Sequence, residues 1–156
     1  MGVDDMTIET VTPLPLAAVR RQLTIANRGA EIIRAPVWSL VEQRGLRSLS
    51  QAVVIYHDRG TEMLLGQPGG VAADIGVLLE ERFDGDNVLQ CVMTPAGRAA
   101  HARHHGHYEM LPVIHGDIRA WCMAQGLTIA GVNWEHFTHW HEDPRQLVTD
   151  VYYLLR

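Results

Sequence analysis

The sequence predicts an α+β fold in which two similar halves each run strand–strand–helix–strand–strand. Apolar residues recur with helical spacing in each half, and the second set follows the first by 81 residues: Ile33, Val37, Leu40 and Val41, then Ile114, Ile118, Trp121 and Cys122. Both helical stretches end in a Gly-Leu pair, and these pairs are also 81 residues apart. We therefore expect one domain, residues 1–156, with repeat 1 over about 6–83 and repeat 2 over about 86–156.

The first half starts with two strands within TIETVTPLPLAAVRRQ, residues 7–22, separated by a proline-marked turn. A helix is expected in AEIIRAPVWSLVEQRG, residues 30–45, and it either begins near Pro36 or kinks there. Strands are expected in AVVIYHD, residues 52–58, and in ADIGVLLEE, residues 73–81. The glycine-rich segment between them, residues 59–73, is either a mobile loop or a lid.

The second half repeats this order, with strands expected within VLQCVMTPAGRAAHARH, residues 88–104. A helix over residues 108–126 accommodates Pro112 in its first turn. Strands follow in NWEHFTHW, residues 133–140, and in TDVYYLLR, residues 149–156. The two halves are expected to join in one antiparallel sheet about a pseudo-two-fold axis, with both helices on one face and a ligand groove on the other.

The composition argues against several classes of protein. The 13 basic residues are all arginines scattered along the chain, and the net charge is −5, so direct binding to nucleic acid is not expected. No apolar stretch is long enough to cross a membrane, and the acidic N-terminus does not resemble a signal peptide. The sequence thus predicts a cytoplasmic protein with no membrane association.

One carboxylate stands out because it lies within an aromatic strand. Alternation along residues 133–140 places Glu135 and Phe137 on one face and Trp134 on the other. The 81-residue spacing makes Tyr56 the counterpart of Phe137 and Val54 the counterpart of Glu135. A strand glutamate commonly points to water, but aromatic residues on its own face favour burial. An unpaired buried charge is costly, so replacement of Glu135 should then leave the protein equally or more stable.

A buried carboxylate among aromatic rings is suited to two kinds of chemistry. The rings attract an organic cation through cation–π contacts, and the carboxylate supplies the counter-charge. Alternatively, burial raises the pKa of a glutamate towards neutrality, where it can act as an acid or a base.

The segment HARHHGHYE, residues 101–109, is rich in histidine, a common metal ligand. Its spacing matches no common metal motif, and strand alternation separates His104 from His105, so no metal site is predicted. Cys91 and Cys122 are expected to be reduced and structural. No cofactor is predicted.

Three segments carry a family resemblance: RHHGHYEMLP (residues 103–112), WEHF (134–137) and DPRQLVTDVYYLL (143–155). They resemble motifs of the gyrase-inhibitor-like (GyrI-like) small-molecule-binding family, which includes effector-binding domains of bacterial multidrug-responsive transcription activators. The resemblance implies a central groove with Glu135 as its carboxylate, together with the aromatic residues Tyr152 and Tyr56. The chain departs from the family pattern where His107 replaces a proline and Phe137 replaces a tyrosine.

Three functions follow from these features. The first is a stand-alone protein that binds hydrophobic, aromatic compounds, cationic ones among them, for sensing or sequestration, with ligand contacts from Glu135, Phe137, Tyr152, Tyr56 and Trp134. The second, which the resemblance also implies, is a hydrolase of reactive cyclopropane-bearing genotoxins in which Glu135 orients or deprotonates water. The third is an interaction with a protein partner, resembling gyrase inhibition.

Overall fold

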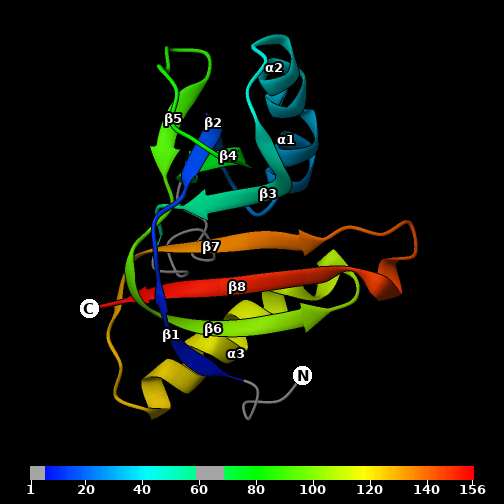
Figure 1. The fold of residues 1–156 in the computed structure, drawn as a ribbon. Helices are drawn as coiled ribbons and strands as arrows, with labels where there is room; N and C mark the ends of the chain where they lie inside the picture. Colours follow the sequence, from blue (N-terminus) through cyan, green and yellow to red (C-terminus); the bar gives the residue numbers. More distant parts are fainter. Residues whose placement is uncertain (1–5, 59–68) are drawn as a thin grey trace.

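The computed structural model describes residues 6–58 and 69–156 and confirms the predicted α+β class (Figure 1). The described residues form one eight-stranded antiparallel sheet with strand order β1-β6-β8-β7-β3-β4-β2-β5. The strands are β1 (Thr7–Val11), β2 (Pro15–Leu23), β3 (Ser48–Tyr56), β4 (Val71–Leu79), β5 (Gln90–Met93), β6 (Gly97–His105), β7 (Ile129–His139) and β8 (Val148–Leu155). Most of the predicted loop or lid, residues 59–68, lies outside the described residues.

The helix expected in the first half is two short helices, α1 (Arg28–Arg34) and α2 (Val37–Gln43). The break falls at Ala35 and Pro36, because a proline has no N–H for a helical hydrogen bond and disfavours helical geometry in the residue before it. Ala35 accordingly has an extended conformation, with φ −58° and ψ 124°.

The second-half helix is α3 (Leu111–Ala124), which follows the 3-10 turn η2 (Tyr108–Met110) and has a proline in its first turn, as predicted. A further 3-10 turn, η3 (Pro144–Gln146), precedes β8. Gly45 and Gly126 end α2 and α3 with positive φ angles of 64° and 70°. In both cases the N–H of the following leucine bonds the carbonyl five residues back, as in a Schellman cap.

The strand order maps onto itself when each strand of the first half is exchanged with its counterpart in the second: β1 with β5, β2 with β6, β3 with β7 and β4 with β8. Val54 in β3 pairs directly with Glu135 in β7, and these two residues are equivalent under the 81-residue spacing. An axis relating the halves would therefore pass through this pair at the centre of the sheet. The duplication itself stays a prediction.

The groove position predicted from the sequence is wrong, because the helix-free face of the sheet is itself packed. All three helices lie on the face that carries Val54 and Val151, with α2 in one buried cluster and α3 in another. On the opposite face lies a third buried cluster: Leu16, Ala18, Val53, Ile55, Leu78, Ala99 and Trp134. Because α1 and α2 cover one end of the sheet and α3 the other, an open groove is left between them on the helix face.

The helix-free face also carries two ion pairs at corresponding places in the halves. Arg20 in β2 bonds both carboxylate oxygens of Asp74 in β4 at 2.9 Å. Arg103 in β6 bonds both oxygens of Asp150 in β8, at 2.9 and 3.1 Å. Both aspartates are buried. Each pair therefore joins neighbouring strands through a two-point contact of matched geometry.

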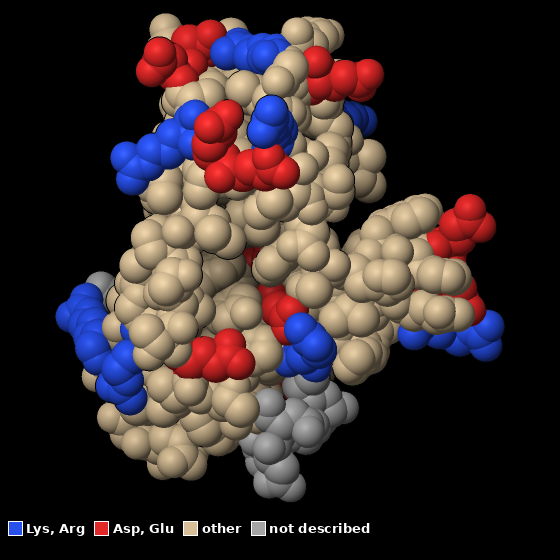
Figure 2. Space-filling model, in the orientation of Figure 1, with Lys and Arg blue, Asp and Glu red and all other residues tan. Residues whose placement is uncertain are grey.

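On the face drawn in Figure 2, basic and acidic residues are interspersed, and no extended patch of one sign covers it. Among the described residues, no helix has the length and apolar character needed to cross a membrane.

The carboxyl of Asp150 links stability to pH. Burial alone would raise its pKa, but hydrogen bonds from His101, Arg103 and Thr138 outweigh burial and hold the pKa below its ordinary value of 3.8. A carboxyl whose pKa is lowered on folding stabilises the folded state above its ordinary pKa. Its contribution is therefore present at neutral pH and is lost as the pH falls below about 4.

We expect Asp150→Asn to lower the free energy of unfolding at pH 7 by about 1 to 3 kcal/mol, because charged hydrogen bonds are lost. The difference from the unsubstituted protein should shrink as the pH approaches 3. Urea unfolding at both pH values measures it, with the exposed Asp84→Asn as the control. A difference that is the same at both pH values would contradict the assignment.

Candidate functional site

A groove on the helix face is the candidate site. Its volume is about 740 Å³, and its floor is formed by the central strands β3 and β7 with part of β4. α1 and α2 form one wall, while the start of α3 and the η2 turn form the other. The lining is mainly apolar and aromatic, and includes Ile32, Ile33, Trp38, Val54, Ile75, Tyr108, Leu111, Phe137 and Trp140. Such a site is suited to hydrophobic, ring-containing compounds.

Glu135 lies at the floor of the groove with no exposed surface. The hydroxyl of Tyr56 donates to its Oε1 at 2.8 Å. Nε2 of His115 lies 2.8 Å from Oε2 and carries the proton, since a carboxylate accepts hydrogen bonds. Nη2 of Arg28 is also near Oε2, at 3.4 Å. Strand β3 and helices α3 and α1 thus each supply one donor to a single carboxylate.

These contacts decide the charge of the site. Burial alone would raise the pKa of Glu135, but the hydrogen bond and charge of His115, the charge of Arg28 and the hydrogen bond from Tyr56 together hold it below its ordinary value. Burial and the charge of Glu135 raise the pKa of Tyr56 well above its ordinary value. At neutral pH, therefore, Glu135 is ionised and Tyr56 is a protonated donor.

The hydrogen-bond network continues beyond His115. Nδ1 of His115 lies 2.6 Å from the hydroxyl of Tyr153 in β8, and Nη1 of Arg119 donates to that hydroxyl at 3.0 Å. Nε2 of His115 donates to Glu135, and its Nδ1 shares a hydrogen bond with the Tyr153 hydroxyl, in which either group can be the donor. Every polar atom named in this chain then has a partner of the correct type.

The structure brings three of the five predicted site residues together. Glu135, Tyr56 and Phe137 share the helix face. Trp134 and Tyr152 lie on the opposite face, where their rings stack with centroids 5.1 Å apart and an interplanar angle of 12°. Strand alternation explains this, because Trp134 precedes Glu135 by one residue in β7 and its side chain therefore points to the other face. Tyr152 pairs with Trp134 and shares that face. As ligand contacts, all five residues stay predictions.

Four partners of this network were missing from the sequence-based set: Arg28, His115, Arg119 and Tyr153. His115 could have been found, because it follows Ile114 and precedes Ile118 by three residues, on the buried side of α3. Tyr153 could also have been found from its alternation with buried residues of β8. Nothing in the sequence indicated Arg28, which is 107 residues from Glu135.

The expectation that Glu135 is an unpaired buried charge is wrong. It has hydrogen-bond partners on both carboxylate oxygens. Its removal would leave buried donors without an acceptor, which reverses the expected effect on stability.

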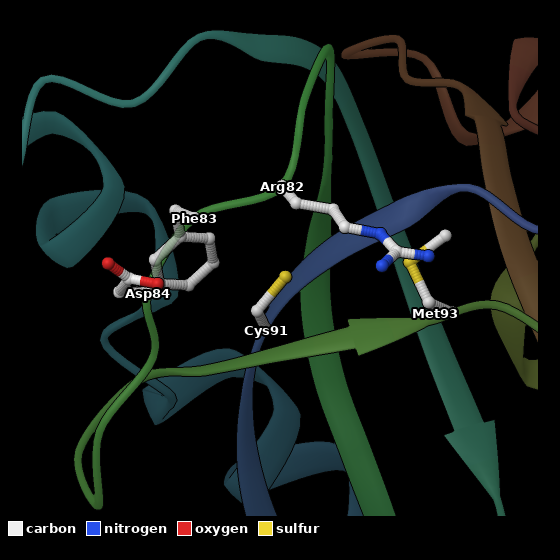
Figure 3. A pocket seen from close by; sticks show the side chains of 5 residues that line it. All are labelled: Arg82, Phe83, Asp84, Cys91 and Met93. Atoms are coloured by element: carbon white, nitrogen blue, oxygen red, sulfur yellow. The ribbon is translucent and has the colours of Figure 1, made fainter.

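A smaller hollow of about 400 Å³ lies between the segment after β4 and strand β5 (Figure 3). Its five lining residues, Arg82, Phe83, Asp84, Cys91 and Met93, include no fully buried side chain and no part of the Glu135 network. Among the described residues, no group of three or more histidine, cysteine or acidic side chains is arranged to hold a metal ion.

The sequence matches the family model of the GyrI-like small molecule binding domain over residues 4–156. A comparison with curated proteins gives no match.

Several solved structures are similar in fold. The EcmrR C-terminal domain has a TM-score of 0.80 and 13% identity, with 97% of this chain and 96% of that chain covered. In a cryo-EM structure of an EcmrR–DNA complex, the match covers 57% of the EcmrR chain. SAV2435 bound to tetraphenylphosphonium has a TM-score of 0.63 and 9% identity, with coverage of 97% and 93%. A hydrolase encoded by lin2189 from Listeria innocua has a TM-score of 0.60 and 10% identity, with coverage of 97% and 92%.

We expect Glu135→Gln to destabilise the protein by about 2 kcal/mol. The substitution removes the negative charge that pairs with Arg28 and His115, and these two groups are then left without a charged acceptor. Urea unfolding at pH 7 measures this change. Glu80→Gln is the matched control, since Glu80 forms an exposed ion pair with Arg47 at 3.8 Å and should change stability little. A Glu135→Gln variant as stable as the control would show that the buried network does not support the fold.

Proposed function

Since this chain belongs to the GyrI-like family of small-molecule-binding domains, we propose that it binds hydrophobic, aromatic compounds in the groove, with a cationic group drawn to Glu135. The observation that carries the proposal is a large apolar groove whose floor holds one ionised carboxylate. Its role is sensing or sequestration of such compounds, as part of a response to drugs or toxins.

The aromatic lining supports this ligand class. The ring of Phe137 contacts that of Tyr108 edge to face, with centroids 5.2 Å apart. At the rim, Trp38 and Trp140 line the groove with half or more of their surface exposed. Because these two large rings are exposed at the edge of an apolar groove, they are candidates to pack on a ligand. SAV2435, which has a similar fold, binds the lipophilic cation tetraphenylphosphonium.

Hydrolysis is the second candidate function, and the pairing of Glu135 with His115 favours it. A hydrolase that uses Glu135 to orient or deprotonate water would employ His115 to position the carboxylate. The Listeria innocua protein of similar fold is described as a hydrolase. However, a carboxylate with a lowered pKa and no exposed surface is a weak base, so binding is the better-supported function.

We expect Phe137→Ala to weaken binding of tetraphenylphosphonium about tenfold, because a ring that lines the groove is lost. Phe83→Ala, which removes a half-buried ring outside the groove, should leave the affinity unchanged. Quenching of tryptophan fluorescence measures both. Equal losses in the two variants would place the ligand elsewhere.

Mass spectrometry of the incubated compounds separates binding from hydrolysis. Intact ligand is the expected result, including with reactive cyclopropane-bearing compounds. A water adduct that disappears in Glu135→Gln would instead establish hydrolysis. A protein-partner role would be favoured by a third outcome. In it no compound binds, and another protein co-purifies equally with the unsubstituted protein and with Glu135→Gln.

A further inference from the structure

Arg28 already occupies the surroundings in which the proposed function places a ligand cation. Its guanidinium approaches Oε2 of Glu135 at 3.4 Å, and its central carbon lies 5.7 Å from the centroid of the Tyr56 ring. A carboxylate beside an aromatic ring is the combination that attracts an organic cation. Arg28 also lines the groove, with 21% of its side chain exposed.

We propose that Arg28 is a resident cation that sets the charge preference of the groove. A cationic ligand must displace the guanidinium from Glu135, whereas a neutral or anionic aromatic compound binds with Arg28 in place. This inference rests on the proposed function and adds a residue that controls ligand class.

The geometry makes Arg28 the replaceable partner of Glu135. Tyr56 and His115 each bond the carboxylate at 2.8 Å, while Arg28 makes one longer contact. A single contact lacks the two-point geometry of strong arginine–carboxylate pairs. When the guanidinium leaves, the two shorter hydrogen bonds still hold Glu135 in position at the groove floor.

The position of Arg28 in the fold allows this displacement. It is the first residue of α1, a helix in which no residue is fully buried. The preceding turn is fixed independently, because Thr24 and Asn27 exchange side-chain-to-backbone hydrogen bonds at 2.7 and 3.1 Å. The long arginine side chain can thus move towards solvent without disturbing the buried clusters under α2 and α3.

The charged residues that line the groove also support this role of Arg28. Among the described residues that line it, Arg28 and Glu135 are the charged ones, and Glu135 has no exposed surface. A ligand entering the groove therefore meets the positive charge first. Removal of Arg28 exposes the carboxylate and changes the sign of the charge that the ligand encounters.

Two ions of the same shape and opposite charge test this inference: tetraphenylphosphonium and tetraphenylborate. We expect Arg28→Met, which keeps an apolar stem, to shift the ratio of their dissociation constants about tenfold in favour of the cation, the equivalent of about 1.4 kcal/mol. Arg28→Gln should shift it in the same direction and serves if the methionine variant does not fold. Arg34→Met is the matched control, since Arg34 lies in α1, is exposed and does not line the groove.

The control should change the ratio by less than about twofold, because salt screens an exposed charge. Equal shifts in Arg28→Met and Arg34→Met, or no shift in either, would overturn the inference. In a Glu135→Gln background Arg28→Met should increase the affinity for the cation less than it does when Glu135 is present, since no carboxylate is uncovered. Absence of binding by either ion and by neutral triphenylphosphine oxide, in every variant, would instead refute the proposed function.

Discussion

A negative charge without exposed surface lies at the centre of the sheet, and the site is organised by the need to stabilise it. Transfer of a carboxylate out of water is costly unless donors surround it. Here the donors come from β3, α1 and α3, so both halves of the chain must be in place before Glu135 is satisfied. The same interaction therefore joins the two halves and defines the floor of the groove.

The carboxylate makes a nearly symmetric framework asymmetric. Glu135 and Val54 face each other on the central strand pair, yet one is charged and the other apolar. Tyr56 and Phe137, which are equivalent under the 81-residue spacing, likewise make different contacts. The hydroxyl of Tyr56 is committed to Glu135, while Phe137 has none and packs on Tyr108. The absent hydroxyl leaves that side of the groove apolar, which suits a ring better than a polar group.

Local patterns in the sequence predicted most of the fold. The helical spacing, the caps at Gly45 and Gly126 and the alternation along β7 are properties of short segments, so no knowledge of tertiary contacts was needed. The position of the groove could not be obtained in this way. It depends on the helix-free face being packed by Trp134 and its neighbours from both halves of the sheet.

The same distinction applies to the site. Alternation placed Glu135 and Phe137 on one face, and the repeat spacing added Tyr56. The family pattern pointed to Tyr152, but the register of β7 and β8 places Tyr153 on the face of Glu135, where it reaches the carboxylate through His115. The position of Arg28 depends on where α1 begins, and α1 is a short helix that ends at the break before Pro36. Contacts of this kind join segments far apart in the chain and follow from register and packing.

The two faces of the sheet differ in a way that matters for binding. On the helix-free face, ion pairs and the stacked rings of Trp134 and Tyr152 tie neighbouring strands together. On the helix face, α1 has no buried residue and contributes a single long contact to Glu135. Strand β3 and helix α3 hold the carboxylate through two short hydrogen bonds, whereas α1 contributes only the longer contact. The proposed function needs a fixed polar group that orients a ligand, and these two hydrogen bonds hold Glu135 in a suitable position for that role.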